Sequence, residues 1–336
     1  MIVGVGVDGR YGFSAAEQRE IARSAVAGGF GSLWTNAVGI PDPFHVCALW
    51  AQAAAGENLR TGISVVGALN WKPQSLAGQA ATVGLLSGGR FTLGIGTGGA
   101  NVRQRPIATM ADYLAVLRPL LDGQEVDYRG PTMDVERTRL NGSFPRVPVY
   151  LAALGPQMLR LAGRAADGAA MSFATPDEIA RQAAIIAGGA AAAGRDRGDV
   201  ALSMYIRVCI DDDAEVARQA FATTVLSYAM APPGADKRFA YRGLFTRMGY
   251  DEVLSDLEAR RDRGASAAEI ARRAPDEMLQ AVGYFGTAAG AAARFAELSA
   301  GLDEAIVRYV AARPGVGPLL AAMDTLSPQA VAGAVA

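Results

Sequence analysis

Short runs of apolar and β-branched residues alternate along the chain with longer stretches in which apolar residues recur at helical spacing. We expect a strand in each short run and a helix in each longer stretch. Helix-start signals separate the two kinds of segment, as in the capping box of Ser14 and Glu17 and in the pair Asp42-Pro43. The expected strands are 2–7, 32–35, 59–66, 90–95, 148–152, 168–172, 201–210 and 305–310.

Eight strand–helix units in strict alternation predict parallel strands, and eight is the number that closes a (β/α)8 barrel, the TIM barrel. Two stretches do not fit the repeat. Residues 123–147 are polar and turn-rich, as in a β-hairpin, and residues 230–285 are helical and charged. Without them about 250 residues remain, the usual size of a barrel that has no insertions. The sequence therefore predicts an α/β fold with one barrel domain over residues 1–336 and insertions after strand 4 and strand 7. A doubly wound open sheet is the alternative that the same alternation permits.

The histidine and cysteine content excludes several kinds of active site. The chain has one histidine, His45, and two cysteines, Cys47 and Cys209, whereas even a catalytic zinc site needs about three nitrogen or sulfur ligands. We therefore expect no metal. A Ser-His-Asp hydrolase would have to use His45, which is expected in the first turn of the helix that Asp42 caps. The sequence also has no G-x-S-x-G motif, so it does not predict a hydrolase.

Charge and hydropathy limit the expected partners. The 32 Lys and Arg residues nearly balance the 33 Asp and Glu residues, and the net charge of −1 argues against nucleic acid. Polar residues or glycines break every apolar run well before about 18 residues, so we expect no membrane span. The first residues lack the basic region of a signal peptide, and two distant cysteines fit reduced thiols. These features predict a cytoplasmic protein.

Two glycine patterns, at residues 4–9 and 94–99, match G-x-G-x-x-G after an expected strand. In a dinucleotide-binding fold the third glycine opens a helix whose amides hold a pyrophosphate, and neither pattern is followed directly by a helix. We interpret residues 94–99 as a tight turn at the carboxyl end of the fourth strand. Such a turn lets a flat ring approach the backbone closely.

The turn between the fifth strand and its helix has no side chain that could cap the helix. Pro156 suits the first helical position, and Gly155 before it leaves the first free amides without a partner. An anionic group from a substrate or cofactor would satisfy these amides and the helix dipole, and simple solvation is the alternative.

Two tryptophans and two asparagines fall at or just beyond expected strand ends, where a barrel places its site. Trp34 and Asn36 lie at the end of the second strand, and Asn70 and Trp71 follow the third. We expect Trp34, Asn70 and Trp71 in a substrate pocket, with core packing as the alternative for Trp34.

Four segments, taken together, follow the pattern of one known family. They are LLSGGRFTLGIGTG at 85–98, GFGSLW at 29–34, VPVYLAALGP at 147–156 and AGRAADG at 162–168. They resemble the bacterial luciferase-like flavin/deazaflavin oxidoreductase family, and the fifth unit resembles its methylenetetrahydromethanopterin reductase-like members. The similarity covers roughly residues 1–230 and resumes at residues 285–287.

The resemblance implies a barrel that holds coenzyme F420 or FMN at the carboxyl ends of its strands. Ile63 and Ser64 match the family's third-strand bulge, often with a non-proline cis peptide, that backs the ring. Thr97 and Gly98 match the loop beside the ring. The phosphate-binding turn is matched by Ala153, Leu154, Gly155, Pro156 and Gln157.

Departures from the family pattern bear on the reaction. Family members often carry Asp-His where this chain has Ala37-Val38, and sugar-phosphate dehydrogenase relatives carry Glu where it has Gly99. Without these groups no general base stands ready to deprotonate an alcohol, so reduction fits better than oxidation. We expect a reductase that transfers hydride from reduced F420 to an activated C=C or C=N of a small molecule or peptide intermediate, for example in secondary metabolism. Tyr11 and Asn36 are the candidate catalytic residues, with Tyr11 or water as the proton source.

Two alternatives stay open. One is an FMN-dependent luciferase-like monooxygenase, and the F420-like fifth unit is what favours the deazaflavin. The other is a non-catalytic binding or partner subunit of the same fold, motivated by the missing polar groups at positions 37, 38 and 99. The expected partners are a small-molecule or peptide substrate and, as an alternative to a monomer, a second copy of the chain. Residues 230–285 are expected to cover the barrel mouth and set specificity.

Overall fold

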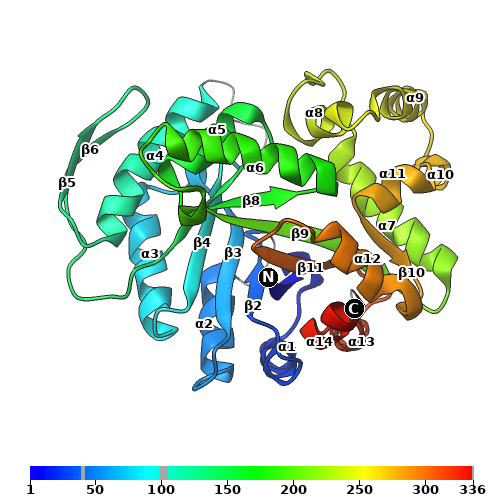
Figure 1. Ribbon diagram of the computed structural model, residues 1–336, viewed down its shortest axis with the longest axis horizontal. Helices are drawn as coiled ribbons and strands as arrows, with labels where there is room; N and C mark the ends of the chain where they lie inside the picture. The colour runs from blue at the N-terminus through cyan, green and yellow to red at the C-terminus, as the bar shows by residue number, and fades with distance from the viewer. Residues whose placement is uncertain (39–41, 99–104, 335–336) are drawn as a thin grey trace.

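Eight parallel strands close into a barrel in the computed structural model, which describes residues 1–38, 42–98 and 105–334 (Figure 1). Each strand pairs with the next one around the barrel, and the last pairs with the first. The expected (β/α)8 barrel is therefore confirmed, and the open sheet is wrong because its edges would stay unpaired. The barrel strands are β1 (Ile2–Val7), β2 (Ser32–Thr35), β3 (Arg60–Gly67), β4 (Phe91–Gly96), β7 (Val149–Ala152), β8 (Gly168–Ser172), β9 (Ala201–Ile210) and β11 (Glu304–Tyr309).

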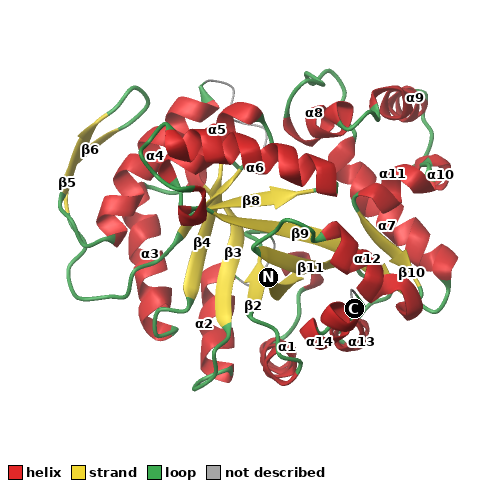
Figure 2. Cartoon of the chain, in the orientation of Figure 1, coloured by secondary structure: helices red, strands yellow, loops and turns green. Residues whose placement is uncertain are grey.

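Helices surround the barrel (Figure 2), and several begin where the sequence predicts. Ser14 and Glu17 form the capping box of the first helix, and Asp42 accepts hydrogen bonds from the amides of Phe44 and His45. No helix in the described part of the chain is both long and apolar enough to cross a membrane. The helices around the barrel are α1 (Ala15–Ala27), α2 (Pro43–Ala53), α3 (Pro73–Leu86), α4 (Pro106–Leu121), α5 (Pro156–Ala165), α6 (Pro176–Ala191), α7 (Ala214–Ala229), α12 (Ala291–Leu298), α13 (Gly317–Thr325) and α14 (Pro328–Gly333).

Two insertions depart from the repeat. Between α4 and β7, the strands β5 (Val126–Arg129) and β6 (Asp134–Thr138) pair as an antiparallel hairpin. After α7 come short helices and a further strand, which pairs in parallel with β9. The sequence analysis predicts only helices in this stretch and misses the strand. These elements are α8 (Ala240–Arg247), α9 (Asp251–Asp262), α10 (Ala267–Arg273), α11 (Asp276–Ala281) and β10 (Gly283–Gly286).

Large side chains fill the lower half of the barrel interior. Trp34, Tyr150, Tyr205 and Ile306, from four different strands, pack there as one cluster. The indole nitrogen of Trp34 donates to a carboxylate oxygen of Glu304 at 3.0 Å, so the one polar atom of this ring is satisfied. These side chains fill the barrel interior toward the amino ends of the strands. A ligand would therefore bind at the carboxyl ends of the strands, which we call the mouth.

The second insertion packs on the mouth. Its apolar side chains, Leu244 and Phe245 among them, form one buried cluster with Phe173 and Val310, which follow β8 and β11. The ring of Phe173 lies 5.7 Å from the ring of Phe245. Because these contacts involve the ends of barrel strands, the insertion is fixed to the barrel at the place where a site would lie.

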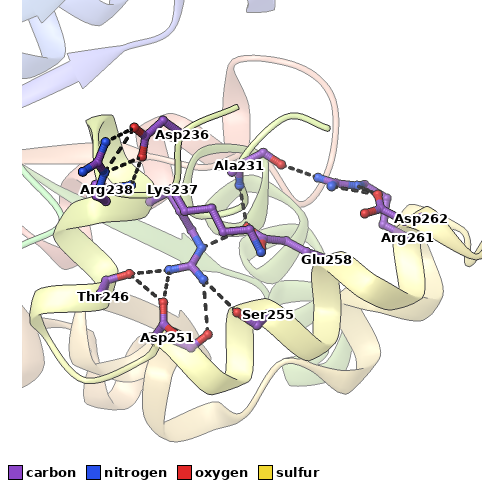
Figure 3. A network of polar contacts seen from close by, with 11 residues as sticks. Ala231, Asp236, Lys237, Arg238, Thr246, Asp251, Ser255, Glu258, Arg261 and Asp262 are labelled. Carbon is purple, nitrogen blue, oxygen red and sulfur yellow. Dashed lines mark hydrogen bonds and ion pairs between the residues drawn. The ribbon is translucent and has the colours of Figure 1, made fainter. Parts of the chain in front are cut away.

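A buried ion pair ties the segments of this insertion together (Figure 3). The guanidinium of Arg242 on α8 donates to the carboxylate of Glu258 on α9 at 2.9 Å, and both residues are buried. Glu258 also accepts from the amide of Ala231 and pairs with Lys237 at 2.6 Å. Burial alone would raise the pKa of Glu258, but its bonds from Lys237, Ala231 and Arg242 hold that pKa below its ordinary value of 4.5.

Replacing Glu258 by glutamine should lower the free energy of unfolding by about 3 kcal/mol at pH 7, because the buried guanidinium of Arg242 loses its buried counter-ion and keeps only the exposed carboxylate of Asp251 at 3.0 Å. Urea denaturation measures this loss. Asp256→Asn is the matched control, since Asp256 forms an exposed pair with Arg260 on the same helix, and the free energy of unfolding should change little.

The Glu258 effect should also depend on pH in one direction. A carboxyl whose pKa is depressed by folding stabilises the protein fully above its unfolded pKa and loses that contribution as the pH falls through the folded value. The difference between wild type and Glu258→Gln should therefore be constant above about pH 5.5 and shrink below pH 4.5. A difference that is absent at pH 7, or that grows on acidification, would contradict this account.

Candidate active site

One side of the mouth is lined by small groups. Gly94 and Gly96 on β4 bear no side chain, and a Cβ at Gly96 would lie 3.0 Å from Val65 and 3.1 Å from the Cβ of Ala152. The side chain of Val65 therefore occupies the space next to Gly96 that a larger residue would need. We call Val65, Gly94, Gly96 and Ala152 the shelf: the two glycines are buried, and the partly exposed side chains of Val65 and Ala152 are small apolar groups against which a ring could stack.

The backbone that supports the shelf is irregular. The register of β3 against β4 shifts between Ile63 and Val66, and the peptide bond between Ser64 and Val65 is cis. The bulge therefore lies where the sequence places it. Ile63 is fully buried behind it.

The loops after β3 and β4 meet beside the shelf. A Cβ at Gly67 would lie 3.1 Å from the Cα of Gly98 and 3.1 Å from the side-chain nitrogen Nδ2 of Asn70. Gly98 has φ of 75°, a left-handed conformation that favours glycine. The structure thus brings Asn70, Thr97 and Gly98 together at one edge of the mouth. Gly99 lies outside the described residues.

The helix α5 begins beside the shelf without a capping side chain. Gly155 is its N-cap and makes no side-chain cap bond, and Pro156 is its first residue, as the sequence predicts. Ala153 before it is buried, and Gln157 in the first turn is exposed. The guanidinium of Arg247, on α8 of the second insertion, donates to the carbonyl oxygen of Leu154 at 2.6 Å. An unpredicted cation therefore stands next to the free amides of this helix, which together favour an anion.

The opposite side of the mouth is lined by charged side chains. Arg308 on β11 forms an ion pair with Asp8 at 2.6 Å, and Arg207 on β9 donates to the hydroxyl of Ser172 at 2.9 Å. Both arginines are only 4% exposed. The Arg207 guanidinium lies 3.5 Å from the centre of the Phe173 ring and 4.7 Å from that of Tyr228. We call Arg207 and Arg308 the cation pair.

The cation pair changes the acidity of its neighbours. Burial alone would raise the pKa of Asp8, but its bonds from Arg10 and the charge of Arg308 hold that pKa well below its ordinary value. Burial likewise would raise the pKa of Tyr228, yet the charges of Arg207, Arg10 and Arg308 lower it. Burial lowers the pKa of Arg207 itself. The mouth therefore holds an ionised carboxylate and a phenol whose pKa lies below its ordinary value.

Trp34 does not line the mouth as predicted. It is 1% exposed and belongs to the lower barrel interior, so its core alternative is the correct one. Its side chain points where the alternation of the strand and the neighbouring side chains direct it. Trp71 packs edge-on against Phe44 at 5.7 Å and borders a hollow beside β6, and its place in a substrate pocket stays a prediction.

The two candidate catalytic residues are engaged with the backbone. The hydroxyl of Tyr11 donates to the carbonyl of Tyr309 at 3.0 Å and accepts from the amide of Ala311 at 3.0 Å. The side-chain oxygen of Asn36 accepts from the amide of Gly9 at 2.9 Å. Because the hydroxyl proton of Tyr11 is engaged in the hydrogen bond to the Tyr309 carbonyl, the structure does not support Tyr11 as a proton donor.

Sequence reasoning missed Arg207, Arg308 and Tyr228. A signal for the arginines was present, because each is a charged residue in the second half of a mostly apolar strand, at the parity that points into the barrel. Tyr228 lies in the last turn of α7, one of the helices around the barrel, and had no such signal. Among the residues described, no three His, Cys, Asp or Glu side chains gather to bind a metal ion.

Comparison with known proteins places this site in a family context. A 5,10-methylenetetrahydromethanopterin reductase from Methanolobus tindarius is 28% identical over 310 residues, covering 88% of this chain and 90% of that protein. An F420-dependent glucose-6-phosphate dehydrogenase from Mycolicibacterium fortuitum is 31% identical over 196 residues, covering 52% of this chain and 57% of that one.

A solved structure shows the same fold. The coenzyme F420-dependent tetrahydromethanopterin reductase from Methanopyrus kandleri matches with a TM-score of 0.76 at 19% identity, over 99% of each chain. Residues 3–304 of this chain match the family described as luciferase-like monooxygenase. Since that match spans most of the sequence, the chain belongs to the luciferase-like monooxygenase family of oxidoreductases.

Proposed function

We propose that this protein is a reductase that uses reduced coenzyme F420 to transfer hydride to an activated C=C or C=N bond of a small molecule or peptide intermediate. The observation that carries the proposal is the state of Asp8. This carboxylate at the mouth is held between Arg10 and Arg308 at 2.8 and 2.6 Å, with its pKa held low. A carboxylate so paired is a poor base, so the mouth favours reduction over removal of a proton from an alcohol.

The residues present fit the coenzyme. The shelf offers small apolar groups, whose packing a Cβ at Gly94 or Gly96 would disturb, and Thr97 and Gly98 follow directly after β4. The turn from Ala153 to Gln157, with Arg247 beside it, would hold a phosphate through the amides of Leu154, Gly155 and Gln157, since Pro156 has no N–H and the amide of Ala153 donates to the carbonyl of Ala170. When bound in its reduced form the coenzyme supplies the hydride. The relatives whose printed names refer to F420 support this choice over FMN.

The protein's own residues would supply orientation, a proton and protection from water. The aromatic side chains of Phe173, Tyr241 and Phe245 cover the mouth from the second insertion's side, with ring centres 5.4 and 5.7 Å apart around Phe173. Tyr228 replaces Tyr11 as the proposed proton source. Its depressed pKa makes the phenol a better donor near neutral pH.

Isotope transfer tests the reaction. With reduced F420 that carries deuterium at C5, we expect oxidation of the coenzyme in the presence of an acceptor such as cyclohexenone or 2-methyl-1-pyrroline. Deuterium should then appear on an acceptor carbon by mass spectrometry. Rapid reduction of oxidised F420 by a simple alcohol or sugar phosphate would contradict the proposal. Oxygen-dependent turnover with FMN and labelled oxygen in the product would favour the monooxygenase alternative.

Gly155→Asp tests where the coenzyme phosphate binds. A carboxylate at the N-cap of α5 would occupy and repel the proposed phosphate position, so F420 affinity should fall by about 1–2 kcal/mol, or roughly tenfold. Gly155→Ala is the matched control, because a Cβ there meets nothing within 4 Å and adds no charge. Titration by fluorescence measures both, and unchanged affinity in Gly155→Asp would place the phosphate elsewhere.

His45→Gln tests whether the one histidine acts in catalysis. His45 is 82% exposed, and its ring contacts the N-cap carboxylate of Asp42 at 2.8 Å. We expect turnover within a few-fold of wild type. A loss of about a thousandfold in kcat, with folding and F420 binding retained, would instead make His45 a catalytic acid or base.

A further inference from the structure

The cation pair carries more positive charge than its surroundings neutralise. Asp8 is the carboxylate that pairs with Arg308, and it is shared with Arg10. Arg207 donates to the neutral hydroxyl of Ser172 and has no carboxylate partner among the residues that the structure describes. The remaining stretches, 39–41, 99–104 and 335–336, contain no Asp or Glu in the sequence. No Asp or Glu side chain other than Asp8 therefore pairs with this site among the described residues.

Such an arrangement is costly unless a ligand completes it. Transfer of a charge into a protein interior carries a penalty of several kcal/mol, which is recovered only through pairing and hydrogen bonds. The Nη1 atom of Arg308 is buried and has no hydrogen-bond partner within residues 1–38, 42–98 and 105–334. Arg207 instead lies over the rings of Phe173 and Tyr228, which compensate a cation only in part. Both groups thus have capacity for an oxygen anion.

We propose that Arg207 and Arg308 form a subsite for a carboxylate of the substrate, on the side of the mouth opposite the shelf. This inference rests on the proposed function for the reaction but not for the binding itself. A planar guanidinium matches a planar carboxylate, and the rings of Phe173, Tyr228 and Tyr241 suit an apolar or aromatic body next to it.

The coenzyme is a less suitable source of this anion. Its phosphate has a proposed place at the start of α5, after β7, where Arg247 stands. Arg207 and Arg308 come from β9 and β11, two and three strands further around the barrel than β7. The phosphate of the coenzyme cannot bind at the start of α5 and at the cation pair at the same time. A substrate that faces the coenzyme ring could reach the cation pair directly.

Benzoate and benzamide provide the probe, because they share size and ring and differ in charge. Thermal denaturation and calorimetric titration of the full chain, with and without F420, compare them at the same concentration. We expect benzoate to bind and raise Tm, and benzamide to bind at least about tenfold more weakly. This comparison on the wild-type chain needs no variant, so it remains decisive if a variant fails to fold.

Arg207→Met should weaken benzoate binding at least about tenfold while leaving Tm without ligand equal to or above that of wild type, since the variant removes an uncompensated buried charge. Arg207→Lys should keep the preference for benzoate over benzamide. Arg260→Met is the matched control, because it makes the same change on the partly exposed face of α9 and should leave benzoate binding unaltered.

Each result has a separate meaning. Equal binding of benzoate and benzamide, or full benzoate binding by Arg207→Met, would overturn the subsite. If Arg207→Met weakened F420 binding at least about tenfold and left benzoate binding unchanged, the anion would belong to the coenzyme, and this inference would also fall. A chain that binds benzoate selectively but does not bind F420 would support the subsite and remove the proposed function.

Discussion

Closure of the eight-stranded sheet is the constraint on which the rest of the molecule depends, because every second side chain of every strand must share one enclosed interior. The lower half is filled by rings from β2, β7 and β9, and the adjacent strands have glycine at the positions paired with Trp34 and Tyr150. A Cβ at Gly62 would strike the indole of Trp34, and one at Gly168 would strike the ring of Tyr150. Glu304 satisfies the indole nitrogen and pairs with Arg60 at 2.9 Å, so the polar groups in this layer support each other.

With the lower interior filled, the two sides of the mouth are free to differ. On β4 and β7 the inward positions hold Gly94, Gly96 and Ala152, which leave room for the bulge of β3. On β9 and β11 the same inward positions hold Arg207 and Arg308. This division follows from residue size and charge alone, and it separates a surface suited to a flat ring from one suited to an anion.

The parts of the fold that were predictable from sequence are those that depend on neighbours close in the chain. The alternation of strands and helices, the caps at Ser14 and Asp42 and the uncapped start of α5 are all local patterns, and the structure contains them. The failures involve partners distant in sequence. The indole of Trp34 bonds to a residue 270 positions away, and the hydroxyl of Tyr11 bonds to one 298 positions away. No local pattern distinguishes such a side chain from one that lines a pocket.

The same reasoning explains why the charged side of the mouth is informative about function. An apolar residue at position 207 or 308 would close the barrel at lower cost, since buried ion pairs are often no more stabilising than apolar packing of equal volume. The chain nevertheless places an arginine at each position and provides a single neighbouring carboxylate, Asp8, which pairs with Arg308 and Arg10 but not with Arg207. A binding role explains why the chain buries these two charges. A site that binds an anionic ligand must leave the position of that anion free of the protein's own carboxylates. In the proposed reductase, an acceptor held by its carboxylate at the cation pair would lie between β9 and β11 on one side and the shelf on the other. Its reacting bond would then face the ring across the barrel axis, with Tyr228 beside it as the proton source.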